Sequence, residues 1–214
     1  EVKNSLVDLI RDNNITGAVT ISWKYLLPLS INEVLEDNLI VLHDSLLPKY
    51  RGFAPTPTAI ICGEREIGVT AIFATEQVDR GDIVMQRSVM ISDDLYIEEI
   101  IRKQAELCAD ILQGLICKME NGKLMGRKQN ENVATYSIWR NPEDCHIDWN
   151  WSAKKIYNFV RALGSPYPGA YTYLCGQKIR IIKSEIIEGD LDFVLRDCGK
   201  IWSISDGKPE IVCG

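Results

Sequence analysis

The spacing of apolar residues changes several times along the first part of the chain, and each spacing predicts a different element. Apolar positions recur at helical spacing over residues 2–10, and residues 15–23 then predict a short buried strand. Helical spacing returns over residues 28–35. Consecutive apolar residues follow at 39–42 and end abruptly at His43, a run that is typical of a parallel strand covered on both faces.

The central part of the chain continues the alternation of strands with helices. Residues 68–73 predict another strand, and the polar segment 75–82 follows at its outgoing end. The longest predicted helix covers residues 93–119, with Ser92 or Asp93 as its N-terminal cap. Its buried stripe consists of isoleucine and leucine residues: Ile97, Ile100, Ile101, Leu107, Ile111, Leu112 and Leu115. Strands that alternate with helices predict an α/β fold.

A connector and one further helix are expected after this long helix. Residues 123–150 are poor in regular pattern and predict a connector that contains a short strand. Ser152 is the expected cap of a helix on which Ile156, Val160 and Leu163 share one face.

The spacing then changes to period two, which predicts a small β subdomain. Strands are expected at 170–174 and 178–187, separated by a turn at 175–177. We therefore predict two domains, a main α/β domain over residues 1–140 and, over residues 141–214, a connector helix with the β subdomain.

Composition and charge restrict the class of protein and of partner. With 214 residues, 46% of them hydrophobic, the chain can bury the core of one main domain and a small second one. No apolar run approaches the roughly 20 residues of a membrane span, and no signal segment is visible, so we expect a cytoplasmic protein. The net charge of −6 argues against a nucleic-acid partner, because phosphate binding requires clustered lysine and arginine. A small-molecule partner is expected, and a homodimer stays open.

Neither the cysteines nor the histidines have the spacing of a metal site. The 7 cysteines are scattered and never form a C-x-x-C pair, which predicts reduced thiols and no bound zinc. Of the 2 histidines, His146 has no ligand spacing around it and is interpreted as a connector residue. The other, His43, lies just past a buried strand, where open α/β sheets place their ligand crevices. The alternative is a histidine that only satisfies a hydrogen bond at a strand end.

Three motifs that begin at His43 change this interpretation. The chain has H-D-S-L-L-P-K-Y-R-G at residues 43–52, G-E-R-E-I-G-V-T at 63–70 and D-R-G-D-I at 79–83. In this order, the patterns H-x-S-L-L-P-x-x-R-G, G-E-x-x-x-G-V-T and D-x-G-D-I resemble the folate-dependent formyltransferase family, which includes methionyl-tRNA formyltransferase and the sugar N-formyltransferases.

The second half of the chain extends the resemblance to nearly the whole sequence. It resembles the connector and C-terminal region of the sugar-modifying members in P-E-D at 142–144, I-D-W at 147–149, S-A at 152–153, V-R-A at 160–162 and P-Y-P-G-A at 166–170. The resemblance implies a Rossmann-like domain with a mostly parallel sheet, followed by a small C-terminal OB-like β subdomain. It also implies that about two strand–helix units, roughly 60 residues, precede Glu1 in the intact family member.

The resemblance implies that His43 and Asp79 are catalytic, since their spacing matches that of the family's histidine and aspartate. An amine attacks the formyl carbon, an oxyanion develops, and an acid–base group moves the amine's proton. His43 would take this role, and Asp79 would hold the imidazole and favour its charged form. The alternative for Asp79 is a plain turn residue in Asp-Arg-Gly-Asp.

One position departs from the family. The third catalytic residue of the family is an asparagine two positions before the histidine, and Val41 stands there. Valine cannot donate a hydrogen bond to an oxyanion, and the loss of one such donor costs about a hundred- to a thousandfold in rate. Catalysis is therefore expected to be impaired unless another donor substitutes; Asp44 and Ser45 are close in sequence, and nothing in the sequence shows that either one does.

The resemblance also implies the ligands and the residues that bind them. The formyl donor would be 10-formyltetrahydrofolate, without a metal, bound through backbone groups at Tyr25, Leu26, Leu27, Thr75, Glu76, Gln77, Val78 and Asp79. Apolar loop residues that cover the core are the alternative. The acceptor side would be shaped by Ser45, Leu46, Leu47, Pro48, Tyr50 and Arg51. Arg51 is a candidate for binding a phosphate or a carboxylate, or for bracing the loop against an acid such as Glu64.

From these features we expect an N-formyltransferase that acts on the amine of a nucleotide-linked amino sugar. Three alternatives stay open: a methionyl-tRNA formyltransferase, a formyltetrahydrofolate hydrolase that uses water as the acceptor, and a non-catalytic protein that binds folate or a sugar nucleotide. The first of these requires a basic face for tRNA that the composition does not offer. The last is raised by Val41.

Overall fold

The computed structural model describes residues 2–23, 28–120, 124–188 and 192–214. It divides into two compact units. The first unit consists of Glu1–Thr56, Glu66–Ile91 and Ile101–Trp139, and the second of Pro57–Arg65, Ser92–Ile100 and Arg140–Gly214. Each unit contains its own hydrophobic cluster. In the described part of the chain, no helix has the length and apolar character needed to cross a membrane.

The first unit is built on a sheet with the strand order β1-β2-β4-β5. These strands are β1 (Ala18–Ile21), β2 (Leu39–His43), β4 (Glu66–Phe73) and β5 (Ile83–Met90). β1 and β2 are parallel, whereas β2 with β4 and β4 with β5 are antiparallel. The α/β class is confirmed, and the sheet is mixed rather than mostly parallel. The loop between β4 and β5 is short enough for antiparallel neighbours, whereas parallel ones need a crossover of about a dozen residues or more.

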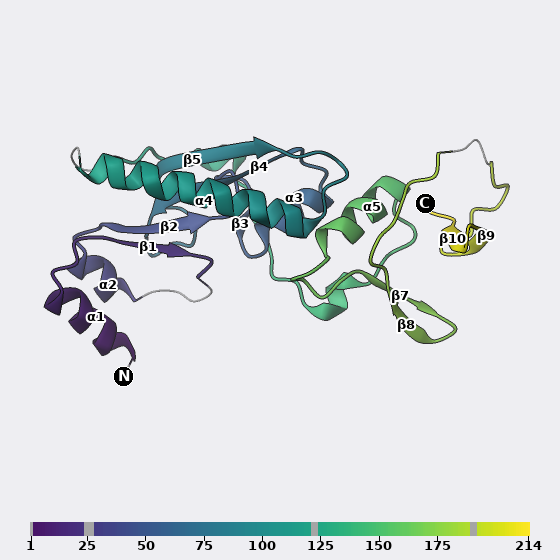
Figure 1. The fold of residues 1–214 in the computed structure, drawn as a ribbon, viewed down its shortest axis with the longest axis horizontal. Helices are drawn as coiled ribbons and strands as arrows, with labels where there is room; N and C mark the ends of the chain where they lie inside the picture. The colour runs from purple at the N-terminus through teal and green to yellow at the C-terminus, as the bar shows by residue number, and fades with distance from the viewer. Residues whose placement is uncertain (1, 24–27, 121–123, 189–191) are drawn as a thin grey trace. The chain divides into compact units, whose positions relative to one another are not determined.

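Helix α4 (Ile97–Glu120) lies across one face of this sheet, as Figure 1 shows. Ile40 and Leu42 of β2 belong to the same buried cluster as Ile111 of α4, so the predicted apolar stripe is the surface that packs. The predicted start of the helix is wrong. The helix begins at Ile97, so neither Ser92 nor Asp93 is its cap, and the carboxylate of Asp93 binds Lys154 at 2.8 Å and Arg65 at 3.1 Å instead.

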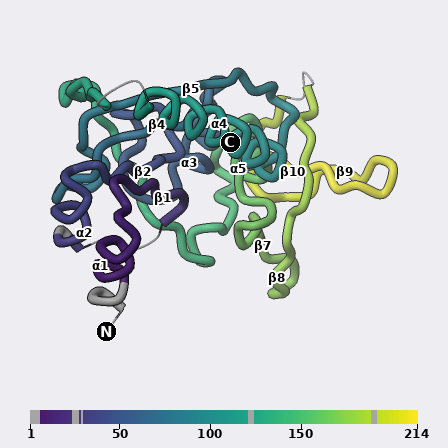
Figure 2. Tube along the Cα trace, turned by 60° about the vertical axis from the view of Figure 1, so that its left-hand side comes forward, coloured from purple at the N-terminus to yellow at the C-terminus, as the bar shows by residue number. Residues whose placement is uncertain are grey.

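Two further helices pack next to β2 in the first unit. Figure 2 shows α1 (Val2–Asp12) and α2 (Leu29–Val34) beside each other. Ile10, Ile31 and Leu39 form a buried cluster there, which confirms both predicted helices. β1 is less buried than the sequence predicted, since Val19 is 37% and Ile21 43% exposed. Both residues occupy alternate positions and therefore share one face of the strand.

The connector pairs with the segment after β2 in a separate, very short parallel ladder. β3 (Arg51–Gly52) follows β2 along the chain, and β6 (Tyr136–Ser137) belongs to the connector, just after the 3-10 turn η1 (Glu131–Val133). Arg51 pairs with Tyr136, and Gly52 pairs with Ser137. This ladder confirms the short strand predicted within 123–150 and brings the connector against the segment that follows His43. Helix α3 (Pro55–Ile61) begins immediately after that segment.

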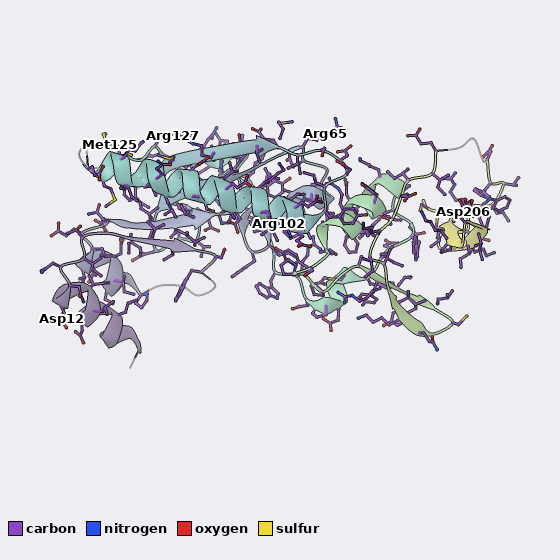
Figure 3. The ribbon with its side chains drawn as sticks, in the orientation of Figure 1. Asp12, Arg65, Arg102, Met125, Arg127 and Asp206 are labelled. Atoms are coloured by element: carbon purple, nitrogen blue, oxygen red, sulfur yellow. The ribbon has the colours of Figure 1, made fainter. Side chains whose placement is uncertain are left out.

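In the second unit, the described residues from Arg140 onward form helix α5 (Ala153–Ala162) and two hairpins. The helix is capped by Ser152, whose Oγ accepts from Lys155 N at 3.3 Å, as predicted. A first hairpin pairs β7 (Tyr171–Leu174) with β8 (Gln177–Arg180), so the second predicted strand ends at Arg180 instead of 187. A second hairpin, which was not expected from the sequence, pairs β9 (Ile201–Ser205) with β10 (Lys208–Ile211), and its turn carries Asp206 (Figure 3). The short 3-10 helix η2 (Pro142–Cys145) begins this part of the chain.

Candidate active site

The structure brings His43 and Asp79 together. His43 is the last residue of β2, and Asp79 lies in the loop between β4 and β5. Nδ1 of His43 is 3.5 Å from Oδ1 of Asp79, and both side chains are nearly buried, with 9% and 11% exposed. Two groups that are far apart in the sequence therefore meet at one end of the sheet.

The loop of Asp79 is shaped by a close backbone approach. A Cβ atom on Gly81 would lie 1.7 Å from the carbonyl oxygen of Phe73, so only glycine allows the loop to fold back onto the end of β4. Asp79 has φ 56°, in the left-handed region that aspartate tolerates better than most residues. Its Oδ2 accepts from Gly52 N at 2.7 Å. Asp79 is thus a turn residue, as one interpretation held, and its carboxylate also faces His43.

Both ring nitrogens of His43 face acceptors. Nε2 lies 2.9 Å from the carbonyl oxygen of Tyr50. A carbonyl only accepts, so Nε2 carries the hydrogen, and a hydrogen on Nδ1 would match the carboxylate of Asp79. The alternative of a histidine that satisfies a hydrogen bond at a strand end is therefore also observed, and the two interpretations are compatible.

A cavity of about 570 Å³ lies beside this pair. That volume is in the usual range for a small-molecule site, about 300–1,000 Å³. Val41, His43, Asp44 and Asp79 contribute to its wall. Large aromatic side chains that had no site role predicted from the sequence, Trp23, Phe53 and Trp139, complete it together with Val78. Phe53 and Trp139 make an edge-to-face pair with ring centroids 5.7 Å apart.

The residues predicted to bind folate differ in their position relative to the cavity. Thr75, Gln77, Val78 and Asp79 line the cavity, whereas Glu76 does not. Tyr25, Leu26 and Leu27 lie outside the described residues. The loop part of the prediction is therefore placed where a ligand of this cavity would lie, and the binding role stays a prediction.

The loop predicted for the acceptor is absent from the cavity lining. None of Ser45, Leu46, Leu47, Pro48, Tyr50 and Arg51 is among the lining residues, and the segment 52–55 directly after them takes that place. Leu47 is buried with Ile72 and Ile83, and Ser45 Oγ donates to Lys49 O at 2.6 Å. These side chains support the loop from inside, and any role toward an acceptor stays a prediction.

The buried side chain of Arg51 binds other residues of the protein. Its side chain is 1% exposed and makes a two-point contact with Glu131, at 2.8 Å from Nη1 and 2.6 Å from Nη2. Gln129 Oε1 accepts from the same guanidinium, and the hydrogen bond from Arg51 lowers the pKa of Glu131. The geometry favours the bracing interpretation, with Glu131 rather than Glu64 as the acidic partner.

Val41 and Asp44 give the cavity an unusual character. Val41 packs against the cluster of Leu47, Ile72 and Ile83 and offers the cavity no donor. Burial raises the pKa of the Asp44 carboxyl, although the neighbouring His43 opposes this. Burial also raises the pKa of the Cys108 thiol to about 11, with a contribution from Asp44. A carboxyl that disfavours its charge therefore borders the same cavity as Val41.

Comparison with known proteins identifies relatives of both parts of the chain. Residues 1–115 match the family model described as formyl transferase, and residues 140–214 match that of the formyl transferase C-terminal domain. The methionyl-tRNA formyltransferase of Caldanaerobacter subterraneus subsp. tengcongensis is 37% identical over 189 residues, 87% of this chain and 61% of the relative. The chain spans about six-tenths of the length of the curated relatives it matches, as the 61% and 60% values show.

Solved structures share the fold. HypX from Aquifex aeolicus in complex with tetrahydrofolic acid superposes with a TM-score of 0.72 at 20% identity, covering 95% of this chain and 35% of that one. A 4-N formyltransferase from Francisella tularensis superposes with a TM-score of 0.66 at 22% identity, covering 86% and 84%. The predicted Rossmann-like formyltransferase fold with a small C-terminal β part is confirmed.

The burial of Asp44 predicts a pH-dependent gain of stability in Asp44→Asn. The pKa of this carboxyl is raised in the folded state above its ordinary value of 3.8. The stability that the protonated carboxyl contributes is therefore fully present below pH 3.8 and is lost as the pH rises through the folded pKa. Asp44→Asn removes the buried charge, so it should melt higher than the wild type at pH 7, by on the order of 2 °C. The difference should shrink toward pH 4, measured by thermal unfolding.

The control is Asp110→Asn, which neutralises an exposed carboxylate on α4. It should not reproduce the pattern. An Asp44→Asn protein that melts lower than the wild type at pH 7 and regains stability in acid would contradict the assignment of a buried, costly charge.

Proposed function

Because the chain belongs to the formyl transferase family, whose model matches residues 1–115, we propose that it transfers a formyl group from 10-formyltetrahydrofolate to an amine, with His43 and Asp79 as catalytic residues. The observation that carries the proposal is the His43–Asp79 contact of 3.5 Å beside a cavity of small-molecule size. A histidine next to a carboxylate, open to a pocket, is the arrangement that proton transfer requires.

The cavity fits a flat, mostly apolar ligand. Its wall combines aromatic side chains, among them Phe53 and Trp139, with the loop of Thr75, Gln77 and Val78. Apolar walls with a few polar groups are what ligand sites of this size present. When bound, the folate would supply the formyl carbon that the amine attacks. Among the solved structures, HypX was determined with tetrahydrofolic acid, which supports a folate for this chain.

The chain's own groups would handle the proton. When the amine bonds to the formyl carbon it loses a proton, and His43 would accept this proton and return it to the departing folate nitrogen. Asp79, next to Nδ1, would stabilise the positive charge on the ring. The opposite nitrogen, Nε2, now donates to the carbonyl of Tyr50. To accept the amine's proton, Nε2 has to be without a hydrogen while Nδ1 keeps one toward Asp79, so the contact with Tyr50 O has to be given up when the amine binds.

For the acceptor, we propose the amine of a nucleotide-linked amino sugar. The motifs at 142–170 that resemble sugar-modifying members support it, as does the net charge of −6, which disfavours a long contact with tRNA phosphates. A second candidate is methionyl-tRNA, which is favoured by the curated relatives, since those at 37% and 35% identity are methionyl-tRNA formyltransferases.

A direct assay separates the two acceptors. The chain is incubated with 10-formyltetrahydrofolate and either a panel of nucleotide-linked 4-amino sugars or methionyl-tRNA. The masses of the products are then measured by mass spectrometry. We expect a sugar nucleotide to gain about 28 Da, the mass of a formyl group that replaces hydrogen in one-carbon chemistry of this class. A sample without any acceptor measures release of formate to water. Formylation of the tRNA alone would overturn the sugar assignment, and formate release alone would assign a hydrolase.

The two proposed catalytic residues give a second prediction. His43→Ala and Asp79→Asn should each lower kcat by about a hundredfold or more, because positioned proton transfer contributes about 10²–10⁴-fold. Asn keeps an acceptor oxygen for the backbone N–H of Gly52, so the loop should survive the change. Unfolding curves like that of the wild type check the fold. Transfer at the wild-type rate in either variant would remove the mechanism, and folate binding without transfer, unchanged in His43→Ala, would indicate a binding protein.

The third prediction concerns Val41. Val41→Asn should raise kcat, by up to about a hundredfold, if a side-chain amide at this position reaches the developing oxyanion. The new amide would be partly buried against Leu47 and Ile72, so a loss of stability is expected at the same time. Val41→Thr, which preserves the shape, is the matched control. An unchanged rate in a folded Val41→Asn protein would mean that another donor already stabilises the oxyanion.

A further inference from the structure

The connector segment 129–137 contacts the surroundings of both His43 and Asp79, although nothing in the sequence assigned it to the site. Gln129 reaches the loop that carries Asp79, while Thr135 and Ser137 reach the residue whose carbonyl accepts from His43. We propose that Gln129 is a positioning residue that holds the carboxylate of Asp79 against His43. This proposal deepens the proposed function and rests on it for its catalytic consequence.

On one side, the amide nitrogen of Gln129 ties two carbonyls of the loop. Nε2 donates to Asp79 O at 2.8 Å and to Gly81 O at 2.8 Å. Asp79 has φ 56°, a conformation that a residue with a side chain keeps only when its neighbours over-determine it. The two hydrogen bonds from Gln129, to the carbonyls on either side of Arg80, hold Asp79 in this conformation.

On the other side, the amide oxygen is fixed by Arg51. Oε1 accepts from Nε at 3.2 Å and from Nη2 at 2.7 Å. A guanidinium only donates and a carbonyl only accepts, so the orientation of the Gln129 amide follows from its partners. Both donors and both acceptor positions of one side chain are used. Arg51 is in turn held by Glu131, which makes it a rigid anchor for Gln129.

The anchor and the carboxylate share one short strand. Arg51 and Gly52 form β3, and Gly52 N donates to Asp79 Oδ2 at 2.7 Å. Gln129 therefore holds the backbone of Asp79 to Arg51, while Gly52 holds its side chain. With both contacts present, Oδ1 is left to face Nδ1 of His43.

The same segment also positions the acceptor of the other ring nitrogen of His43. Thr135 Oγ1 accepts from Tyr50 N at 2.9 Å, and Ser137 Oγ donates to Tyr50 O at 3.3 Å. Tyr50 has φ 59°, and its carbonyl oxygen is the acceptor of His43 Nε2. Both acceptors of the ring are thus placed by residues of the connector.

The proposal predicts which substitutions at Gln129 are harmful. Gln129→Glu keeps the acceptor for Arg51 but turns a carboxylate oxygen toward the two loop carbonyls, and Gln129→Leu removes both sets of bonds. Each should lower kcat by about tenfold or more, because displacement of a reacting group by about 1 Å costs up to a hundredfold. KM for the folate should change less than kcat. Gln113→Glu, an exposed position on α4, introduces the same charge as a control and should change neither.

A double-mutant cycle separates positioning from general support of the fold. If Gln129 acts through Asp79, then Gln129→Glu should have little further effect on kcat in an Asp79→Asn protein. Losses that multiply in the double variant would contradict the proposal. So would a fall in activity that only follows a fall in melting temperature.

The second measurement does not depend on activity. In protein with ¹⁵N-labelled histidine, only His43 and His146 contribute imidazole signals, so His146 serves as the internal reference. Both Gln129→Leu and Gln129→Glu should shift the ring nitrogen signals of His43 and leave those of His146 unchanged. If the wild type transfers no formyl group, the proposed function fails while this measurement still tests the positioning. Unchanged His43 signals in both folded variants would overturn it.

Discussion

The close approach of Gly81 to the end of β4 is the constraint on which the site depends. A Cβ atom at position 81 would collide with the carbonyl of Phe73, and Phe73 N donates to Asp82 O at 3.1 Å across the same turn. The loop therefore folds back at once instead of extending into solvent. This return places Asp79 beside the last residue of β2. The register of the sheet contributes as well, since His43 stands opposite Thr70 on β4.

The regular part of the fold could be predicted wherever burial is periodic. The stripe of α4 and the cap of α5 at Ser152 depend on local spacing, and the structure confirms both. The start of α4 could not be predicted, because Asp93 binds Lys154 and Arg65, which are distant in the sequence. The missed hairpin β9–β10 had a local signal: Asp206 and Gly207 both have positive φ, and Asp-Gly is a preferred hairpin turn.

Some residues of the candidate site could likewise be predicted from the sequence, whereas others are brought to it only by the fold. His43 and Asp79 were found because family motifs give their order and spacing, and the structure brings them together. None of the residues predicted for the acceptor lines the cavity, because side chains such as Ser45, Leu47 and Arg51 are buried, whereas Gly52 and Phe53 directly after them do line it. Gln129 could not be found from sequence, because its partners, Arg51 and the carbonyls of Asp79 and Gly81, are far from it along the chain.

The charge of the cavity wall indicates which end of a substrate it can hold. Among the described residues that line it, the ionisable groups are His43, Asp44 and Asp79, and no lysine or arginine is present. Phosphates are bound by lysine, arginine and backbone N–H groups, so a wall with two carboxyls is a poor site for a nucleotide's phosphates. An amine, in contrast, is complementary to carboxyl groups, and an apolar ring system suits the aromatic side chains. The reacting ends of the two proposed substrates therefore match this cavity, and the described side chains of its wall offer no cation to the phosphates of the proposed acceptor.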